Sequence, residues 1–544
     1  MSEALRSALS LLALLALGAA GRSGLVGQTR DAVLLALSAL ALIGLVRRHP
    51  APTPPLGPRI ATLFYAVWAA GFIILTSTTD AAGRRSFCLF DDAMVSMRYA
   101  WNLAHGRGLV WNPPERIEGF TNLLMTLLMT LPVRLLDKSS AVLAIQVLGA
   151  LLVLVAARLS LAVARRAADD PAAPAWVFVA VLAYYPLSYW TLLGMETGLL
   201  TVLLLGATLL VLRHHDDPRF QWPLVTLLAA AVTTRPDALV PASLLLLFRA
   251  GGLPSGRRRG VGWEAAAMAA VLAGLTALRW SYYGEPLPNT YYLKMEGYPL
   301  AVRCGNGVRF VLPFLVSMVP ALALAAWGLI VRRDRRKLLL VALSTSILLS
   351  QVWVGGDVWP RWRMLCPAVP LVMILMVDGA WRLADRAASG AARRAVAAAA
   401  VSLGLLAANG AFVRELFLAV YPFSVTDNQV NVAAGLELAR ICTPTARVGV
   451  FYAGTVPYYS GLPALDFLGK SDRHIAHLPP DLSLPVGHNK FDLQYSIVEQ
   501  RPDYVERFQW ARVDLSAFAR EHYVKVNGLW LLRGSPNVRW ELLR

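Results

Sequence analysis

Long apolar segments recur along most of the chain, and many are close to the length that spans a lipid bilayer. A helix needs about 20 mostly apolar residues to cross the hydrocarbon core. Only 16% of the 544 residues are charged, against roughly 25% in an average soluble protein. The sequence therefore predicts an α-helical polytopic membrane protein. The apolar segments cover 7–20, 33–46, 60–77, 141–164, 174–190, 197–213, 221–233, 236–250, 262–282, 307–331, 338–353, 364–381 and 395–418.

Basic residues gather in the connections between alternate segments. Such loops stay on the cytoplasmic side of a membrane, so the net charge of +18 indicates orientation and not a nucleic-acid partner. A further apolar segment, 120–136, would put every later basic cluster on the wrong side if it crossed. We therefore predict a re-entrant or interfacial helix there, and about 13 crossings with the N-terminus inside and the C-terminus outside. The clusters lie in 1–6, 47–59, 165–166, 213–219, 249–259, 332–337 and 382–394.

The apolar segments end before residue 424, and three regions are predicted. Residues 1–59 carry additional N-terminal membrane segments, 60–423 form the membrane domain, and 424–544 form a soluble α/β domain on the outer side. In the last region, 446–454 has the pattern of a buried strand, and 523–534 predicts a hairpin with Asn-Gly at its turn. Segment 7–20 has the length of a signal peptide, but its weakly basic start favours an uncleaved span.

One predicted outer loop, 90–122 (FDDAMVSMRYAWNLAHGRGLVWNPPERIEGFTN), is dense in carboxylates, arginines and aromatic residues. Asp91 and Asp92 begin a predicted helix in which Asp91, Val95 and Arg98 share a face. An N-cap accounts for one aspartate. Because a cap needs only one carboxylate, the pair points to a catalytic site, where a carboxylate can act on an acceptor hydroxyl or face an anomeric carbon.

Four more predicted outer loops carry candidate groups. Each has an ordinary explanation: an acid favoured by a helix dipole, a local ion pair, or aromatic anchors at the interface. Arginine forks suit phosphate, however, and all these loops share one side of the membrane. A site facing outward, away from ATP and nucleotide sugars, would use a donor already carried in the membrane. The groups are Glu196 in GMET, Arg235 and Asp237 in TRPD, Tyr291 and Lys294 in NTYYLK, and Asp357, Arg361 and Arg363 in GGDVWPRWR.

Cofactor signatures do not occur in this sequence. The four cysteines form no CxxC pair, and there is no Walker loop, GxGxxG or HExxH. We therefore predict no cofactor and no metal ligands, although a divalent cation beside the carboxylates would be compatible with the chemistry.

The same loops resemble a known family. The loop 90–122, together with LLGMETGLL, TRPDALV, GEPLPNTYYLK, GGDVWPRWRMLCPAVP and AGTVPYYSGLPALDFLGKSDRHIAHLPP, resembles the mycobacterial terminal β-(1→2)-arabinofuranosyltransferases and their bacterial relatives. The resemblance covers roughly residues 60–544. It implies a GT-C membrane glycosyltransferase with a catalytic aspartate in the first outer loop, a polyprenyl-phosphate sugar donor and a carbohydrate-binding C-terminal domain.

On this basis Asp91 and Asp92 are predicted to be catalytic. We expect Arg98, Arg235, Lys294, Arg361 and Arg363 to bind the donor phosphate. The groups expected to bind sugar are Glu118, Glu196, Asp237, Asn289, Tyr291, Asp357, Asp466, Asp472 and His474.

The predicted function is transfer of a sugar, arabinofuranose by the resemblance, from polyprenyl phosphate to a cell-envelope glycan. The protein would lie among the lipids of the inner (plasma) membrane with its active site on the outer face. The C-terminal domain would position the acceptor while the membrane domain binds the donor. Two alternatives stay open: a flippase or transporter of lipid-linked sugars, and a non-catalytic scaffold that binds glycans.

Overall fold

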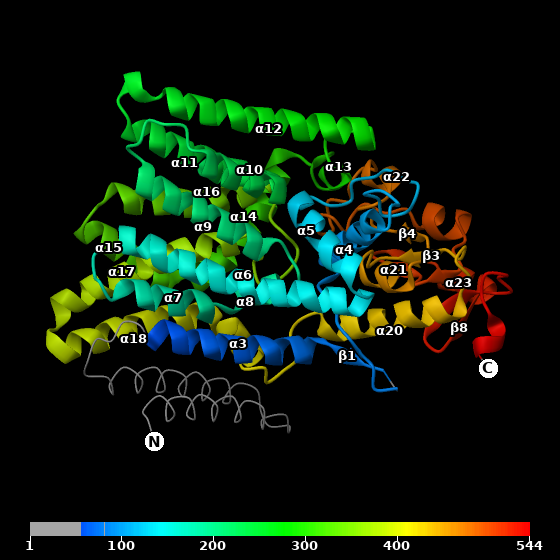
Figure 1. Cartoon of the computed structure of the whole chain (residues 1–544). Helices are drawn as coiled ribbons and strands as arrows, with labels where there is room; N and C mark the ends of the chain where they lie inside the picture. Colours follow the sequence, from blue (N-terminus) through cyan, green and yellow to red (C-terminus); the bar gives the residue numbers. More distant parts are fainter. Residues whose placement is uncertain (1–55, 81, 544) are drawn as a thin grey trace.

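The computed structural model describes residues 56–80 and 82–543. In Figure 1 a bundle of long helices occupies one side and a small sheet with short helices the other. The predicted spans 7–20 and 33–46 lie outside the described residues. The described part of the chain is mostly helical, as the sequence predicts.

Strongly apolar helices form the bundle. By length and composition, the described residues contain eight helices able to cross a membrane, or nine if the bent pair α7–α8 is one span. The bundle helices are α3 (Leu56–Thr76), α6 (Lys138–Ala167), α7 (Ala173–Ala183), α8 (Tyr185–Leu192), α9 (Thr197–His214), α10 (Trp222–Thr234), α11 (Leu239–Gly252), α12 (Arg259–Tyr283), α14 (Leu300–Ser317), α15 (Val319–Val331), α16 (Arg335–Val354), α17 (Val369–Ala387) and α18 (Gly390–Asn409).

Two predicted crossings, 221–233 and 236–250, correspond to α10 and α11, which have only 13 and 14 residues. Both nevertheless run between the two ends of α9. Arg235, directly after α10, donates to Glu196 at the start of α9, and Arg249 of α11 donates to the carbonyl of His214 at the other end. The predicted single span 307–331 is two helices, α14 and α15, that meet at Met318 just before Pro320.

The predicted basic clusters that fall within the described residues, from 165–166 to 382–394, lie together at one end of the bundle. Arg336 donates to the carbonyl of Arg166 at 2.9 Å. The buried ammonium of Lys337 pairs with Asp378 at 2.6 Å and with Asp169 at 2.7 Å. We call this end the basic end, and the opposite end, which carries the polar loops and the C-terminal sheet, the loop end. The alternation of helix directions thus agrees with the one predicted from the arginines.

Helix α5 (Leu123–Leu135) stays at the loop end beside α4 (Asp91–Ala104). Ser96 of α4 donates to Asn122, just before α5, at 3.0 Å. Arg134, near the other end of α5, donates to the carbonyl of Ala104 at 3.2 Å. Since both ends of α5 touch α4, this helix does not run to the basic end, in agreement with the prediction that 120–136 does not cross.

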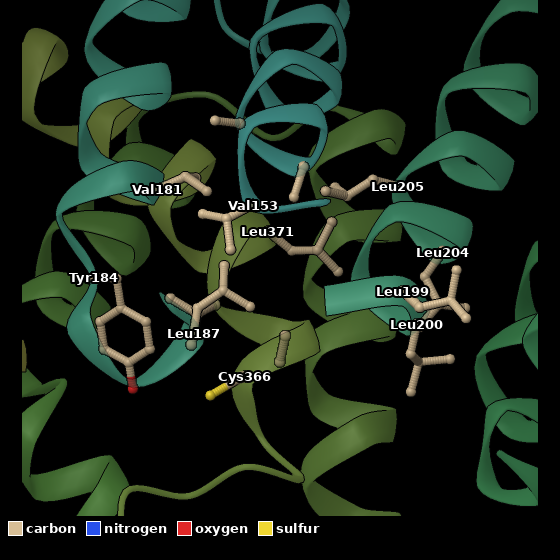
Figure 2. Packing of buried hydrophobic residues seen from close by; sticks show 14 of the residues in the cluster. Val153, Val181, Tyr184, Leu187, Leu199, Leu200, Leu204, Leu205, Cys366 and Leu371 are labelled. Carbon is tan, nitrogen blue, oxygen red and sulfur yellow. The ribbon is translucent and has the colours of Figure 1, made fainter. Parts of the chain in front are cut away.

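The interior of the bundle is filled by aliphatic side chains and by close helix contacts. Gly149 of α6 meets the carbonyl of Thr191, and an added Cβ would lie 2.3 Å from that oxygen. Small residues at such points allow helix backbones to approach closely. Figure 2 shows part of the buried cluster, including Val153, Val181, Leu187, Leu205 and Leu371.

The C-terminal segment begins with α20 (Val425–Ile441) and builds a five-stranded mixed sheet of order β4-β3-β5-β9-β8. Strand β3 pairs in parallel with β4 and β5, whereas β9 pairs antiparallel with β5 and β8. The predicted buried strand is β3, and the predicted hairpin is β8–β9 with Asn527 and Gly528 at positive φ. The strands are β3 (Val448–Val450), β4 (Ala464–Asp466), β5 (Tyr504–Val505), β8 (Tyr523–Val526) and β9 (Leu529–Leu532).

Candidate active site

A cavity of about 550 Å³ lies at the loop end, between the bundle and the C-terminal segment. One wall is apolar and is built by side chains of α11 and α12, among them Val240, Leu272 and Leu275. The other wall is ionic. Its charged groups are Asp92, Glu196, Arg235, Asp237, Arg279, Lys294, Asp357, Arg363 and Lys470. A cavity with an apolar and an ionic side suits an amphipathic ligand that carries a charged head group.

Asp92 lies in the ionic wall between two cations from distant parts of the chain. Its Oδ2 accepts from Arg363 at 2.8 Å, and its Oδ1 pairs with the ammonium of Lys470. Burial by itself would raise the pKa of Asp92, but the positive charges of Lys470, Arg363 and Lys294 hold it well below its usual range. Asp92 is therefore an ionised carboxylate at neutral pH.

Asp91 does not line this cavity. Its buried carboxylate accepts backbone N–H groups of Gly454 and Thr455, the latter at 2.8 Å. Only glycine fits at 454, because an added Cβ would lie 2.0 Å from the Asp91 carbonyl oxygen. Burial raises the pKa of Asp91 to about 6. The structure thus gives the two aspartates different places: Asp91 joins α4 to the C-terminal segment, and Asp92 faces the cavity.

Arg235 holds the turn between α10 and α11 against the start of α9. It pairs with Glu196 at 2.8 Å and with Asp237 at 2.8 Å. Asp237 also accepts from Gln351 at 3.0 Å, and Glu196 from Asn122 at 3.1 Å. The predicted local pair of Arg235 and Asp237 is present, and it belongs to a network that lines the cavity.

Lys294 projects from α13 (Asn289–Met295) into the cavity. Its ammonium has no ion pair or hydrogen bond within the described part of the chain. Burial lowers the pKa of Lys294, and the nearby charge of Asp357 acts in the opposite direction. Asp357 itself is held by Arg363, whose guanidinium also reaches Asp92. An ammonium without a fixed anion at a cavity wall is suited to a phosphate.

Two of the predicted phosphate ligands lie elsewhere. Arg98 is buried on the face of α4 that meets the C-terminal segment, where it donates to the carbonyls of Trp111 and Leu462. Arg361 pairs with Glu415 and lies over the ring of Phe423. Neither Arg98 nor Arg361 lines the cavity that Lys294 enters, so their predicted binding of the donor phosphate stays a prediction.

Five of the predicted sugar-binding groups also lie outside this cavity. Glu118 pairs with Arg279 at 2.9 Å behind the cavity wall. The side-chain nitrogen of Asn289 donates to three backbone carbonyls of residues 469, 470 and 472, so it fixes the loop that carries Lys470. Asp466 accepts from the backbone of the same loop, Asp472 caps a short helix, and His474 is half exposed. Glu196, Asp237, Tyr291 and Asp357 do line the cavity.

Sequence reasoning missed three groups that the fold brings into the cavity. Lys470 contacts Asp92, although 378 positions separate them in the sequence. Asn122 and Gln351 complete the network around Arg235. Lys470 lies inside the matched stretch AGTVPYYSGLPALDFLGKSDRHIAHLPP, so that stretch held a signal, but no spacing rule connects it to α4. The C-terminal domain was expected to position the acceptor and the membrane domain to bind the donor. The two parts are not so clearly separated, because the C-terminal segment contributes Lys470 to the cavity.

No three His, Cys, Asp or Glu side chains within 56–80 and 82–543 are placed to hold a metal ion. The carboxylates of the ionic wall are instead engaged by arginines and lysines.

The comparisons with known proteins concern the fold. Residues 421–540 match a family described as a domain of unknown function (DUF8728). No curated protein matches the sequence. The chain is similar to the crystal structure of ArnT from Cupriavidus metallidurans bound to undecaprenyl phosphate, with a TM-score of 0.54 and 13% identity over 86% of this chain and 91% of that one.

The apo structure of the same ArnT gives a TM-score of 0.48 at 14% identity over 86% and 90% of the two chains. At such identity the likeness to the bound form shows the fold alone. The described residues thus have the GT-C fold that the resemblance implies, a helical membrane bundle joined to a small C-terminal sheet.

Proposed function

We propose that this protein is a membrane glycosyltransferase that moves a sugar from a polyprenyl-phosphate donor to a cell-envelope glycan. The proposed site is the cavity around Asp92, on the outer face of the inner (plasma) membrane. The resemblance of the loops to arabinofuranosyltransferases makes arabinofuranose the proposed sugar. The likeness to a structure that holds undecaprenyl phosphate supports a polyprenyl-phosphate donor.

The ammonium of Lys294, which is unpaired among the described residues, carries this proposal. Its lining holds five cations and four carboxylates, and Lys294 alone among these cations lacks an ion pair within the described residues. A sugar joined to polyprenyl phosphate is a phosphodiester with one negative charge. Bound beside Lys294, it would neutralise that charge, while its chain could lie along the apolar wall of α11 and α12.

The charge on the phosphate grows during the reaction. The acceptor oxygen forms a bond to the anomeric carbon, the bond from that carbon to the phosphate oxygen breaks, and its electron pair leaves with the phosphate. Polyprenyl phosphate then carries up to two negative charges. Lys294, Arg363 and Lys470 line the cavity and would stabilise this developing charge.

Asp92 is the proposed acceptor of the proton from the attacking hydroxyl. In the described structure its pKa is depressed by Lys470 and Arg363. A bound phosphate would compete for these cations, weaken their hold on Asp92 and so raise its pKa toward a more basic value. The proton would pass from Asp92 to bulk water after transfer.

The test uses the purified full-length protein in lipid nanodiscs. Supplied with polyprenyl-phosphate arabinofuranose and an oligosaccharide acceptor, it should form one new glycosidic linkage for each polyprenyl phosphate released, as measured by mass spectrometry. Lys294→Ala should lose most of this turnover. Movement of the donor across liposome membranes without any new linkage would instead identify a flippase, and binding of glycan with neither activity would identify a scaffold.

A further inference from the structure

A second cavity, of about 340 Å³, opens at the loop end where α4 and the loop after it meet the C-terminal segment. It shares no lining residue with the cavity around Asp92. Arg98 and Arg107 line it, and so do the ring of Trp101 and the ring of Tyr458. No aspartate or glutamate is among its lining residues.

Arg98 is a buried cation, and no carboxylate of the described residues pairs with it. It is 5% exposed, and its four hydrogen bonds go to three backbone carbonyls and to the side-chain oxygen of Asn112. A guanidinium has five N–H donors, so one N–H remains for another acceptor. Burial lowers the pKa of Arg98 to about 9, and the charge of Arg107 acts in the same direction. Arg98 stays cationic at neutral pH.

Of two further cations, Arg107 lines this cavity, and Lys138 lies beside the lining rings of Trp101 and Tyr458. Arg107 is exposed, and its guanidinium has no ion pair within 56–80 and 82–543. Lys138 donates to the carbonyl of Tyr459 at 3.1 Å and lies 5.3 Å from the ring centroid of Trp101. The neighbouring Asp137 accepts backbone N–H groups at the start of α6 and forms no pair with Lys138.

Three like charges close together repel one another and favour a bound anion. Rings and prolines in the same wall suit the apolar face of a sugar. We propose that this second cavity binds an acidic sugar, one that carries a phosphate or carboxylate group. A single sugar unit fits the size of the cavity better than an extended lipid or peptide surface.

This inference rests on the proposed function for one step only, the assignment of the acidic sugar to the acceptor glycan. The acidic unit would anchor the glycan on one side of the α4–C-terminal contact while another part of it reaches Asp92. Binding in the second cavity can be measured without any transfer reaction. If the proposed transfer activity fails, the proposed binding of an acidic sugar can therefore still be tested, and the reverse also holds.

The binding experiment uses full-length protein in nanodiscs of neutral phosphatidylcholine, with glucose 6-phosphate, glucuronate, glucose and inorganic phosphate as probes. Calorimetry should detect the two acidic sugars and not glucose. Arg107→Ala should weaken their binding by about tenfold or more, the effect of losing a charge-assisted hydrogen bond. Arg116→Ala is the matched control, because Arg116 is in the same loop, stacks on Tyr282 and does not line the cavity.

Several outcomes would overturn the proposal. They are unchanged binding in Arg107→Ala, an equal loss in Arg116→Ala, and inorganic phosphate binding as tightly as glucose 6-phosphate. Binding of the acidic sugars that occurs in neutral nanodiscs but is lost in nanodiscs of anionic phosphatidylglycerol would assign the cations to the membrane surface instead. In transfer assays, Arg107→Ala should raise KM for an acidic acceptor and leave KM for the donor unchanged.

Discussion

Replacing Asp92 by asparagine tests whether the two aspartates that begin α4 have different roles. Asparagine keeps the shape of the side chain but removes its ion pairs with Arg363, at 2.8 Å, and with Lys470. Unit charges at that distance attract by roughly 6 kcal/mol at an effective dielectric constant near 20, before the cost of desolvation. Breaking a buried pair costs about 3–5 kcal/mol. We expect the lower end, because Arg363 keeps Asp357 and Asp92 is 17% exposed.

The activity of Asp92→Asn should fall even in the fraction of the protein that stays folded. Loss of a positioned base lowers turnover by about 10²–10⁴-fold. The assay is sugar transfer by protein in nanodiscs, with kcat and KM for donor and acceptor measured separately, beside thermal unfolding followed by tryptophan fluorescence. The folded variant should show the loss in kcat.

Asp91→Asn is the matched control. It removes one acceptor from the backbone N–H groups of Gly454 and Thr455, and a buried N–H left without a partner costs about 1–3 kcal/mol. We expect a lower melting temperature and near-normal turnover in the folded fraction. If Asp92→Asn turns over at the wild-type rate, or if Asp91→Asn abolishes turnover without loss of stability, the assignment of roles is refuted.

Three other expectations can be checked separately. Because burial raises the pKa of Asp91 to about 6, above about 3.9 in the unfolded chain, the protonated carboxyl stabilises the folded state, and this contribution is lost as pH rises from about 4 to 6. Burial raises the pKa of Asp466 in the same way, so the fall in melting temperature over this range should be smaller in Asp91→Asn than in the wild type; an unchanged slope would contradict the burial of Asp91. Lys294→Arg should retain part of the turnover that Lys294→Ala loses, measured as kcat/KM for the donor, since the charge stays; equal losses would argue against a phosphate there. In a cysteine-free background of intact cells, an impermeant thiol reagent should label an exposed cysteine placed near Gly355 and miss one placed near Asp334; the opposite labelling would place the cavity inside.

The sequence alone determined the membrane class, the directions of the helices and the loops that carry the polar groups. These properties depend on local composition: an apolar run long enough to span a bilayer, and arginines that stay on one side of it. The prediction that 120–136 does not cross followed from the same parity, whereas its contact with α4 came from the structure. The Asn527-Gly528 hairpin was predictable because its turn is decided by two adjacent residues.

Only the tertiary structure decided which polar groups share a cavity. Helical spacing placed Asp91 and Arg98 on one face of α4, but it could not show that the C-terminal segment covers this face and uses both side chains. Nor could it pair Asp92 with Lys470, because no local rule relates residues so far apart in the sequence. Contacts between distant segments depend on how whole helices and loops pack, and a side chain one position along a helix points to a different neighbour.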